Sequence, residues 1–322
     1  KQRPVSMKKT GIYFMIPALL FYMLLFPEKV LADSLAGLNL WFHTVLPSLL
    51  PFMILSNVLI GANAISILMR PFSGFFRHGL GLSPEGGYAW LLGLFCGFPM
   101  GARLTGTMYR EKKISREEAD YLLTFANQSS PMFLSTYVIL HGLRDTSLTV
   151  PVFAVFYGSA FLTGLVFRIL GRRFHLPPSA PEAAVSKKEV SQQTSYGNLL
   201  DTSIMNGFEV ITRLGGYIIL FSILAGIVMQ LPSPLHTAAP FLSGMTEITT
   251  GIHTISGTAL SPQVKFIAVI CSTAFGGLST VAQTSCMLGG TGLSILTYLK
   301  GKLVNTLIAG LLCLVAAVLF LK

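Results

Sequence analysis

Long apolar runs separated by short polar or basic segments make up almost the whole chain. The runs cover residues 12–26, 45–60, 88–108, 121–140, 150–170, 214–230, 265–288 and 291–322. A helix needs about 20 apolar residues to cross a bilayer, and it satisfies its backbone hydrogen bonds internally, as lipid requires. The pattern therefore predicts an all-α polytopic membrane protein with several transmembrane helices.

The run over 88–108 is interrupted near its middle. Gly97, Pro99 and Gly101 lie close together there, and none of them fits comfortably inside a regular helix. A break at this depth frees backbone N–H and C=O groups that lipid cannot satisfy, so it should face protein, water or a ligand. Basic residues flank the run on both sides, as they do in cytoplasmic loops. We therefore predict a re-entrant helical hairpin with both ends in the cytoplasm.

A similar interruption returns in the second half of the chain. A phenylalanine, a glycine, an alanine and a polar end residue recur in the same register at 275–283 as at 95–103. We predict a second re-entrant hairpin over 265–288, with its tip at 275–280. Two broken apolar segments at matching places in two halves are typical of the substrate site of a transporter.

Another kind of interruption lies in the run over 121–140. Residues 127–131 are polar or helix-breaking, and the proline among them should kink the helix. Ser115 is the expected N-cap of this helix, with Glu118 at the third helical position. Residues 303–305 in the final helix weakly resemble residues 125–127, and this resemblance aligns Asn305 with Asn127.

These elements predict four parts of the chain. Residues 1–34 form an N-terminal transmembrane helix, for which a cleaved signal peptide is the alternative. Residues 35–147 form a first repeat of span, hairpin and interrupted helix, and 148–200 a connecting span and cytoplasmic linker. Residues 201–322 form a second, inverted repeat, with 231–262 as an outer loop and a final helix that ends inside.

Composition and charge support a membrane protein. Of 322 residues, 52% are hydrophobic and 11% are charged, whereas soluble domains carry about 25% charged residues. The net charge of +10 comes from clusters near the N-terminus and around 70–77, 103–116 and 168–188. Such clusters mark cytoplasmic loops rather than nucleic-acid binding, and they place the N-terminus in the cytoplasm.

The chain carries no recognisable catalytic or metal motif. Its four cysteines and six histidines show no metal-ligand spacing, and it has neither a nucleotide-binding loop nor a nucleophile elbow. We therefore expect no enzyme activity, no ATP-driven transport and no cofactor, although sodium or a proton could be a coupling cation.

Two charged residues are candidates for function. Arg103 lies within one turn of the first break, where a charge is costly and could pair with a carboxylate. Arg103 snorkelling to the inner surface is the equally weighted alternative. Glu247 could bind a coupling proton or cation, or it could cap a helix or lie at the surface.

Helix N-termini created by the breaks carry partial positive charge and suit an anionic group. Hydroxyl and amide side chains beside two matching breaks point to a ligand more than to helix packing alone. The predicted substrate-binding residues are Cys96, Gly97, Pro99, Gly101, Arg103, Asn127, Ser129, Ser130, Gly276, Gly277, Ser279, Thr280, Gln283 and Asn305.

Four segments together resemble the YlbJ-type sporulation integral membrane proteins. They are residues 95–102, 114–119, 125–131 and 246–251. The resemblance implies paired nucleoside-recognition Gate domains, similar to those of concentrative nucleoside transporters. It also implies movement of dipicolinic acid across the outer forespore membrane of a spore-forming bacterium.

We therefore expect a transporter for a small organic anion, dipicolinate by resemblance, that works by alternating access. The alternatives are a carrier of nucleosides or other small molecules, and a non-transporting scaffold for sporulation. The expected partners are the anion and membrane lipid but no nucleic acid, and the sequence leaves a homo-oligomer open. The expected location is the cell membrane or the outer forespore membrane.

Overall fold

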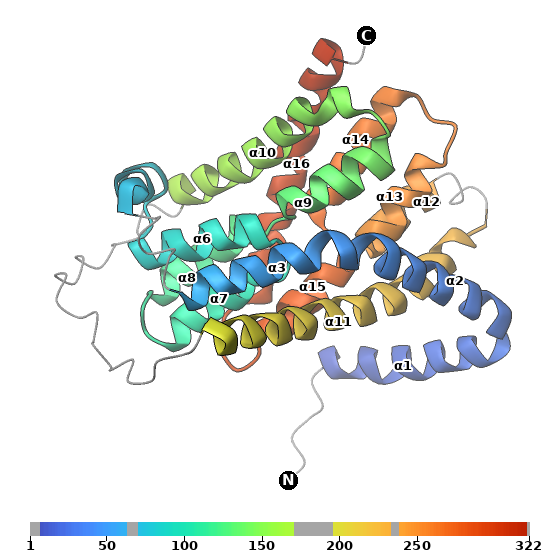
Figure 1. Cartoon of the computed structure of the whole chain (residues 1–322). Helices are drawn as coiled ribbons and strands as arrows, with labels where there is room; N and C mark the ends of the chain where they lie inside the picture. The colour runs from blue at the N-terminus through green and yellow to red at the C-terminus, as the bar shows by residue number, and fades with distance from the viewer. Residues whose placement is uncertain (1–6, 63–69, 171–195, 233–237, 321–322) are drawn as a thin grey trace.

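The computed structural model describes residues 7–62, 70–170, 196–232 and 238–320 (Figure 1). All regular structure in these ranges is helical, which confirms the predicted all-α class. Four helical segments there are long and apolar enough to cross a membrane, or five if one bent pair counts as a span. The chain is therefore a polytopic membrane protein.

Three helices open the chain. They are α1 (Met7–Leu25), α2 (Pro27–Leu40) and α3 (Leu46–Gly61), with a π-helical turn over Trp41–Val45. Both α2 and α3 pack against α11 (Tyr196–Met229), the first helix after the connecting segment. The Trp41 indole N–H donates to the Ile211 carbonyl over 2.9 Å. The predicted linker over 171–193 lies outside the described residues.

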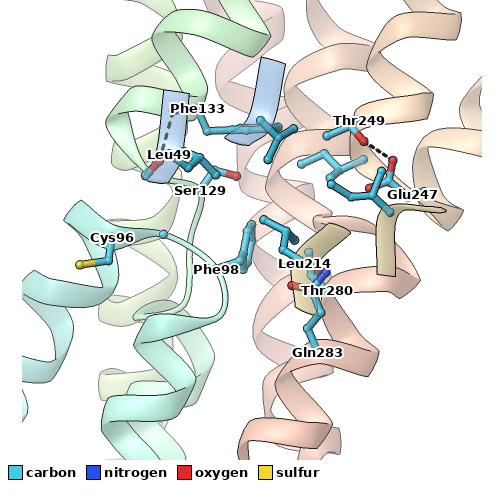
Figure 2. Close-up of a pocket in the computed structure, with 15 residues that line it drawn as sticks. Leu49, Cys96, Phe98, Ser129, Phe133, Leu214, Glu247, Thr249, Thr280 and Gln283 are labelled. Carbon is cyan, nitrogen blue, oxygen red and sulfur yellow. Dashed lines mark hydrogen bonds between the residues drawn. The ribbon is translucent and has the colours of Figure 1, made fainter. Parts of the chain in front are cut away.

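The first predicted hairpin is formed by α6 (Pro84–Cys96) and α7 (Met100–Arg110). Short turns precede it, at Arg70–Phe72, Ser73–Phe75 and Phe76–Leu80. The helices pack against each other, and the chain reverses at Gly97, whose φ is +75°, and Phe98 (Figure 2). A Cβ on Gly93 would lie 2.8 Å from the Gly101 Cα. Two glycines are thus what lets the two backbones cross so closely.

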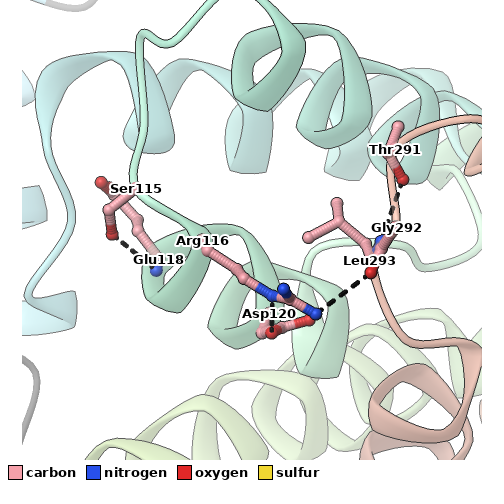
Figure 3. Close-up of polar contacts among 7 residues, drawn as sticks. All are labelled: Ser115, Arg116, Glu118, Asp120, Thr291, Gly292 and Leu293. Atoms are coloured by element: carbon pink, nitrogen blue, oxygen red, sulfur yellow. Dashed lines mark hydrogen bonds and ion pairs between the residues drawn. The ribbon is translucent and has the colours of Figure 1, made fainter.

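The interrupted helix consists of α8 (Arg116–Phe125), α9 (Pro131–Phe133) and a π-helix over Leu134–Leu143. Ser115 accepts the Glu118 N–H over 3.1 Å (Figure 3), which confirms the predicted N-cap. Residues 126–130 leave the helix between α8 and α9, as predicted. A short turn at Thr146–Leu148 then leads into α10 (Thr149–Leu170).

A second helical hairpin lies where the sequence predicted an outer loop. It consists of α12 (Ala239–Thr246) and α13 (Ile248–Ser256), which pack against each other. The break between them is the extended residue Glu247. A Cβ on Gly251 would overlap the Gly244 backbone, so this hairpin also closes on a glycine pair.

The predicted hairpin over 265–288 is wrong. Its two arms, α14 (Pro262–Phe275) and α15 (Gly277–Met287), continue in one direction as a 26-residue apolar segment. Gly276 and Gly277 have φ angles of +85° and +76°, which interrupt the helical hydrogen bonds without reversing the chain. The second break therefore corresponds in shape to 126–130, and not to 97–99.

Contacts at the two ends of this segment fix its direction. The Lys265 side chain near its start donates to the Ser256 carbonyl over 3.0 Å. Just beyond its end, the Gly292 carbonyl accepts from Arg116 at the start of α8 over 3.2 Å (Figure 3). The α14–α15 segment therefore starts at the face of the protein where the two ends of the second hairpin lie. It finishes at the face where α8 begins.

The last helix, α16 (Ile295–Phe320), starts beside α8 and runs back along α14 (Figure 1). Asn305 contacts Ala274, and Gly310 lies near Cys271, so the two helices are antiparallel. The predictions that α8 begins in the cytoplasm and that α16 ends there therefore cannot both hold, because α16 starts beside the beginning of α8 and ends at the opposite face. The four cysteines, which all lie in the described ranges, form no disulfide bond.

The glycine pair of the second hairpin can be tested by stability. Gly251→Ala should lower the free energy of unfolding by about 1–3 kcal/mol, because overpacking displaces backbone. Gly216→Ala in α11 is the control, since nothing lies within 4 Å of a Cβ there. Thermal unfolding of the detergent-purified variants is the measurement. Equal melting temperatures for both variants would contradict the close crossing.

Candidate functional site

The four helix breaks, at 97–99, 126–130, 247 and 276–277, meet around one pocket (Figure 2). Its cavity volume is about 40 Å³, which is room for a few water molecules. Its walls come from both hairpin tips, both interrupted spans, α3 with the turn before it, and α11. The lining residues are Val45, Leu49, Cys96, Gly97, Phe98, Ser129, Ser130, Phe133, Leu214, Ile218, Glu247, Ile248, Thr249, Thr280 and Gln283.

Each break starts a new helix at the pocket. These helices are α7 after Pro99, α9 after Ser130, α13 after Glu247 and α15 after Gly276. A helix N-terminus presents unpaired N–H groups and partial positive charge. Helix N-termini from both halves of the chain therefore favour negative charge at this place.

Side chains cap three of these four N-termini. Ser130 accepts the Phe133 N–H over 3.1 Å, and Glu247 accepts the Thr250 N–H over 2.7 Å. The Asn127 side chain accepts the Ala102 N–H of α7 over 3.3 Å. In the described part of the chain, the first turn of α15 has no side-chain cap. Its N–H groups are therefore the ones left for an acceptor from elsewhere.

Two buried polar atoms on the pocket wall have no hydrogen-bond partner among the described residues. They are the Ser129 hydroxyl and the Gln283 side-chain carbonyl. An unsatisfied buried polar group costs about 1–3 kcal/mol, so such groups call for a ligand or water. The pocket thus offers one hydroxyl and one amide carbonyl to a small molecule.

Glu247 is both a helix cap and a buried pocket residue. Its carboxylate caps α13 and also accepts from the Thr249 hydroxyl, and the residue is 1% exposed. Figure 2 shows the Thr249 contact at the edge of the pocket. The predicted capping role is confirmed, and the surface alternative is wrong because the second hairpin buries the side chain.

Asn127 and Asn305 hold the broken segments together. Asn127 donates to the Thr284 hydroxyl over 2.9 Å in addition to capping α7. Asn305 donates to the Ala274 carbonyl over 3.2 Å, next to the break in α14–α15. Their hydrogen bonds go to protein, and neither lines the pocket. Both residues therefore satisfy backbone that the breaks would otherwise leave unpaired.

Comparison with known proteins gives one relative. The chain is 30% identical over 312 aligned positions to the sporulation integral membrane protein YlbJ of Bacillus subtilis strain 168. The match covers 87% of this chain and 75% of the relative. The chain belongs to the YlbJ family. No protein-family model and no solved structure matches it, so the paired Gate domains stay a prediction.

The structure brings part of the predicted site of this YlbJ family member together. The predicted residues that line the pocket are Cys96, Gly97, Ser129, Ser130, Thr280, Gln283 and the ion candidate Glu247. Pro99 lines a smaller neighbouring pocket. Ser279 accepts the Gln283 amide over 3.1 Å. Gly101, Gly276 and Gly277 shape the backbone rather than the pocket wall.

Arg103 is not brought to the pocket. It lies half-buried on α7 and lines neither pocket. Among the hydrogen bonds and ion pairs of the described residues, its guanidinium has no acceptor. This arginine therefore contributes no charged group to the pocket wall.

Two parts of the pocket wall were not predicted from the sequence. Phe98 lies within the predicted motif, but its ring was not assigned a role. Leu214 and Ile218 lie one turn apart on α11 and form the apolar wall. In the sequence they cannot be told from lipid-facing residues, whereas Thr249 could have been found from its place beside Glu247.

Asn127 and Ser129 should respond differently to mutation. Asn127→Ala should destabilise the protein by about 1–3 kcal/mol, because it leaves buried groups of α7 and α15 unpaired. Ser129→Ala removes a hydroxyl without a partner and should leave the melting temperature unchanged or higher. Thermal unfolding without ligand compares them, and a larger loss in Ser129→Ala would contradict these assignments.

Proposed function

We propose that this protein is a secondary transporter or facilitator for a small organic anion. The observation that carries the proposal is the meeting of four helix breaks, with their N-termini, at one pocket. Breaks in membrane-embedded helices are costly unless they are buried in protein or line a cavity, and here they line one. Helix N-termini near the membrane centre bind anionic substrate groups in other transporters.

We also propose an inverted repeat with revised boundaries. In the first half, α3, the α6–α7 hairpin, the broken α8–α9 span and α10 follow one another. In the second half, α11, the α12–α13 hairpin, the broken α14–α15 span and α16 follow in the same order. The two hairpins enter from opposite faces, because Ser83 before α6 bonds Glu118 of α8, whereas the second hairpin's ends lie at the start of α14. Two such units can rock about a shared site, which is alternating access.

Dipicolinate is the substrate we propose within this class. It is a flat pyridine with two carboxylates, and the YlbJ relative is a sporulation protein by name. One carboxylate would accept from the uncapped first turn of α15, and the ring would lie against apolar residues such as Leu214. We place the protein in the outer forespore membrane on the same basis.

A nucleoside carrier is the second candidate. Glu247 and Gln283 on the pocket wall favour it, because carboxylate and amide groups can bind sugar hydroxyls. If the substrate is an organic anion instead, Glu247 would serve as the site of a coupling proton or sodium ion. A non-transporting scaffold is less well supported, since a scaffold has no need of buried polar groups without partners.

Ligand-induced stabilisation tests the proposal. A ligand that binds only the folded protein raises the melting temperature with concentration. We expect dipicolinate to raise it in detergent-purified protein, and a nucleoside panel to leave it unchanged, each measured with and without sodium. A shift with nucleosides alone would replace the substrate class, and no shift with either would contradict a transporter of these solutes.

A matched pair of variants assigns the shift to the pocket. Gln283→Leu removes the pocket amide and should reduce the dipicolinate shift. Gln230→Leu makes the same change on an exposed side chain that bonds Lys29 and Tyr22, and it should retain the full shift. Equal shifts in both variants would place binding elsewhere.

A further inference from the structure

Lys302 is a fully buried cation in the middle of α16. The residue is 1% exposed and shares the inner face of the helix with Asn305, Ala309 and Cys313. The opposite face carries exposed leucines such as Leu303. Lys302 therefore points into the protein and does not snorkel to a membrane surface.

The surroundings of the Lys302 ammonium do not neutralise it. Its Nζ donates to the Gln128 side-chain carbonyl over 2.8 Å, which is the one hydrogen bond that its three donors make with described residues. It also lies 4.5 Å from the centroid of the Phe98 ring and 5.8 Å from that of Tyr298. In the described ranges, no carboxylate lies within 4.0 Å of it. A buried ammonium without a counter-ion is costly and is normally functional.

The Phe98 ring contacts both Lys302 and the pocket. Phe98 lines the pocket, and Lys302 lies over its ring. Figure 2 shows the Phe98 side chain extending from the first hairpin tip toward Leu214 and Thr280. Thr280, another pocket residue, shares a hydrogen bond with Tyr298, one turn before Lys302. The ammonium therefore lies beside a residue of the pocket wall.

We propose that Lys302 binds a carboxylate of the anionic substrate, and that the Phe98 ring turns aside to admit it. The ammonium would then exchange its cation–π contact with Phe98 for a charge-assisted hydrogen bond, which is the stronger interaction. Gln128 holds the ammonium in place through its side-chain carbonyl. If the ammonium moved toward the substrate, that carbonyl would still accept from the Asn305 amide at 3.5 Å. The inference rests on the proposed function and gives Lys302 the role that the sequence assigned to Arg103.

Dipicolinate and its uncharged diamide, pyridine-2,6-dicarboxamide, are suitable probes, because they share one ring and shape. Wild-type protein should bind the dianion at least about ten-fold more tightly than the diamide. Lys302→Gln and Lys302→Met should lose roughly ten- to a hundred-fold in dipicolinate affinity and keep the diamide affinity. Arg103→Gln is the control and should retain the preference for the dianion. Titration calorimetry of the four purified proteins with both probes gives all eight affinities.

The outcomes separate the two proposals. Equal affinity of Lys302→Gln and wild-type protein for dipicolinate would overturn the role of Lys302 and leave the transporter intact. Equal wild-type affinities for the dianion and the diamide would also overturn the role of Lys302, and this comparison does not depend on whether the variants fold. Wild-type protein that binds neither probe would overturn both.

Stability without ligand gives a second readout. Removing an unpaired buried charge relieves its desolvation cost, so Lys302→Met should melt at or above the wild-type temperature. A lysine kept for structure would behave in the opposite way. A clear fall in melting temperature with unchanged dipicolinate affinity would therefore assign Lys302 to folding and overturn the inference.

Discussion

The need to satisfy backbone polar groups inside the membrane governs this structure. Each break in a helix frees N–H and C=O groups that lipid cannot pair. The protein gathers its four breaks at one place, where polar side chains of neighbouring segments meet them. Asn127 serves α7 and α15 together, Asn305 serves the end of α14, and Ser130 and Glu247 cap the helices that follow them. The result is a pocket whose buried polar groups are only partly hydrogen-bonded by the protein.

Close backbone packing makes this gathering possible. The two hairpins cross on the glycine pairs Gly93–Gly101 and Gly244–Gly251, since larger residues would hold their arms apart. Gly301 similarly lets α16 touch the backbone of Thr124 in α8. That contact carries Lys302 to within reach of Gln128 and Phe98. The position of the buried lysine thus depends on the small residue that precedes it in the sequence.

Sequence patterns predicted the parts that depend on local chemistry. The all-α class follows from apolar run length, the hairpin tip at Gly97 from glycine and proline, and the Ser115 cap from its spacing to Glu118. The second hairpin escaped prediction, because its break at Glu247 contains neither glycine nor proline. In sequence, the Gly276–Gly277 pair is compatible with a chain reversal or with a local interruption of a continuing helix. The contact of Arg116 with Gly292, just beyond α15, shows that the chain continues. The lining from Leu214 and Ile218 depends on which face of α11 meets the hairpins, and hydrophobicity alone does not specify that.

The central claim is that the four breaks form the binding site for a small organic anion. An experimental structure of the purified protein with dipicolinate tests this claim most directly. The account predicts ligand density between the two hairpin tips, in contact with Ser129, Thr280 and Gln283, with the Phe98 ring turned aside so that Lys302 contacts the ligand. Ligand density outside this pocket, with the pocket residues unchanged, would contradict it.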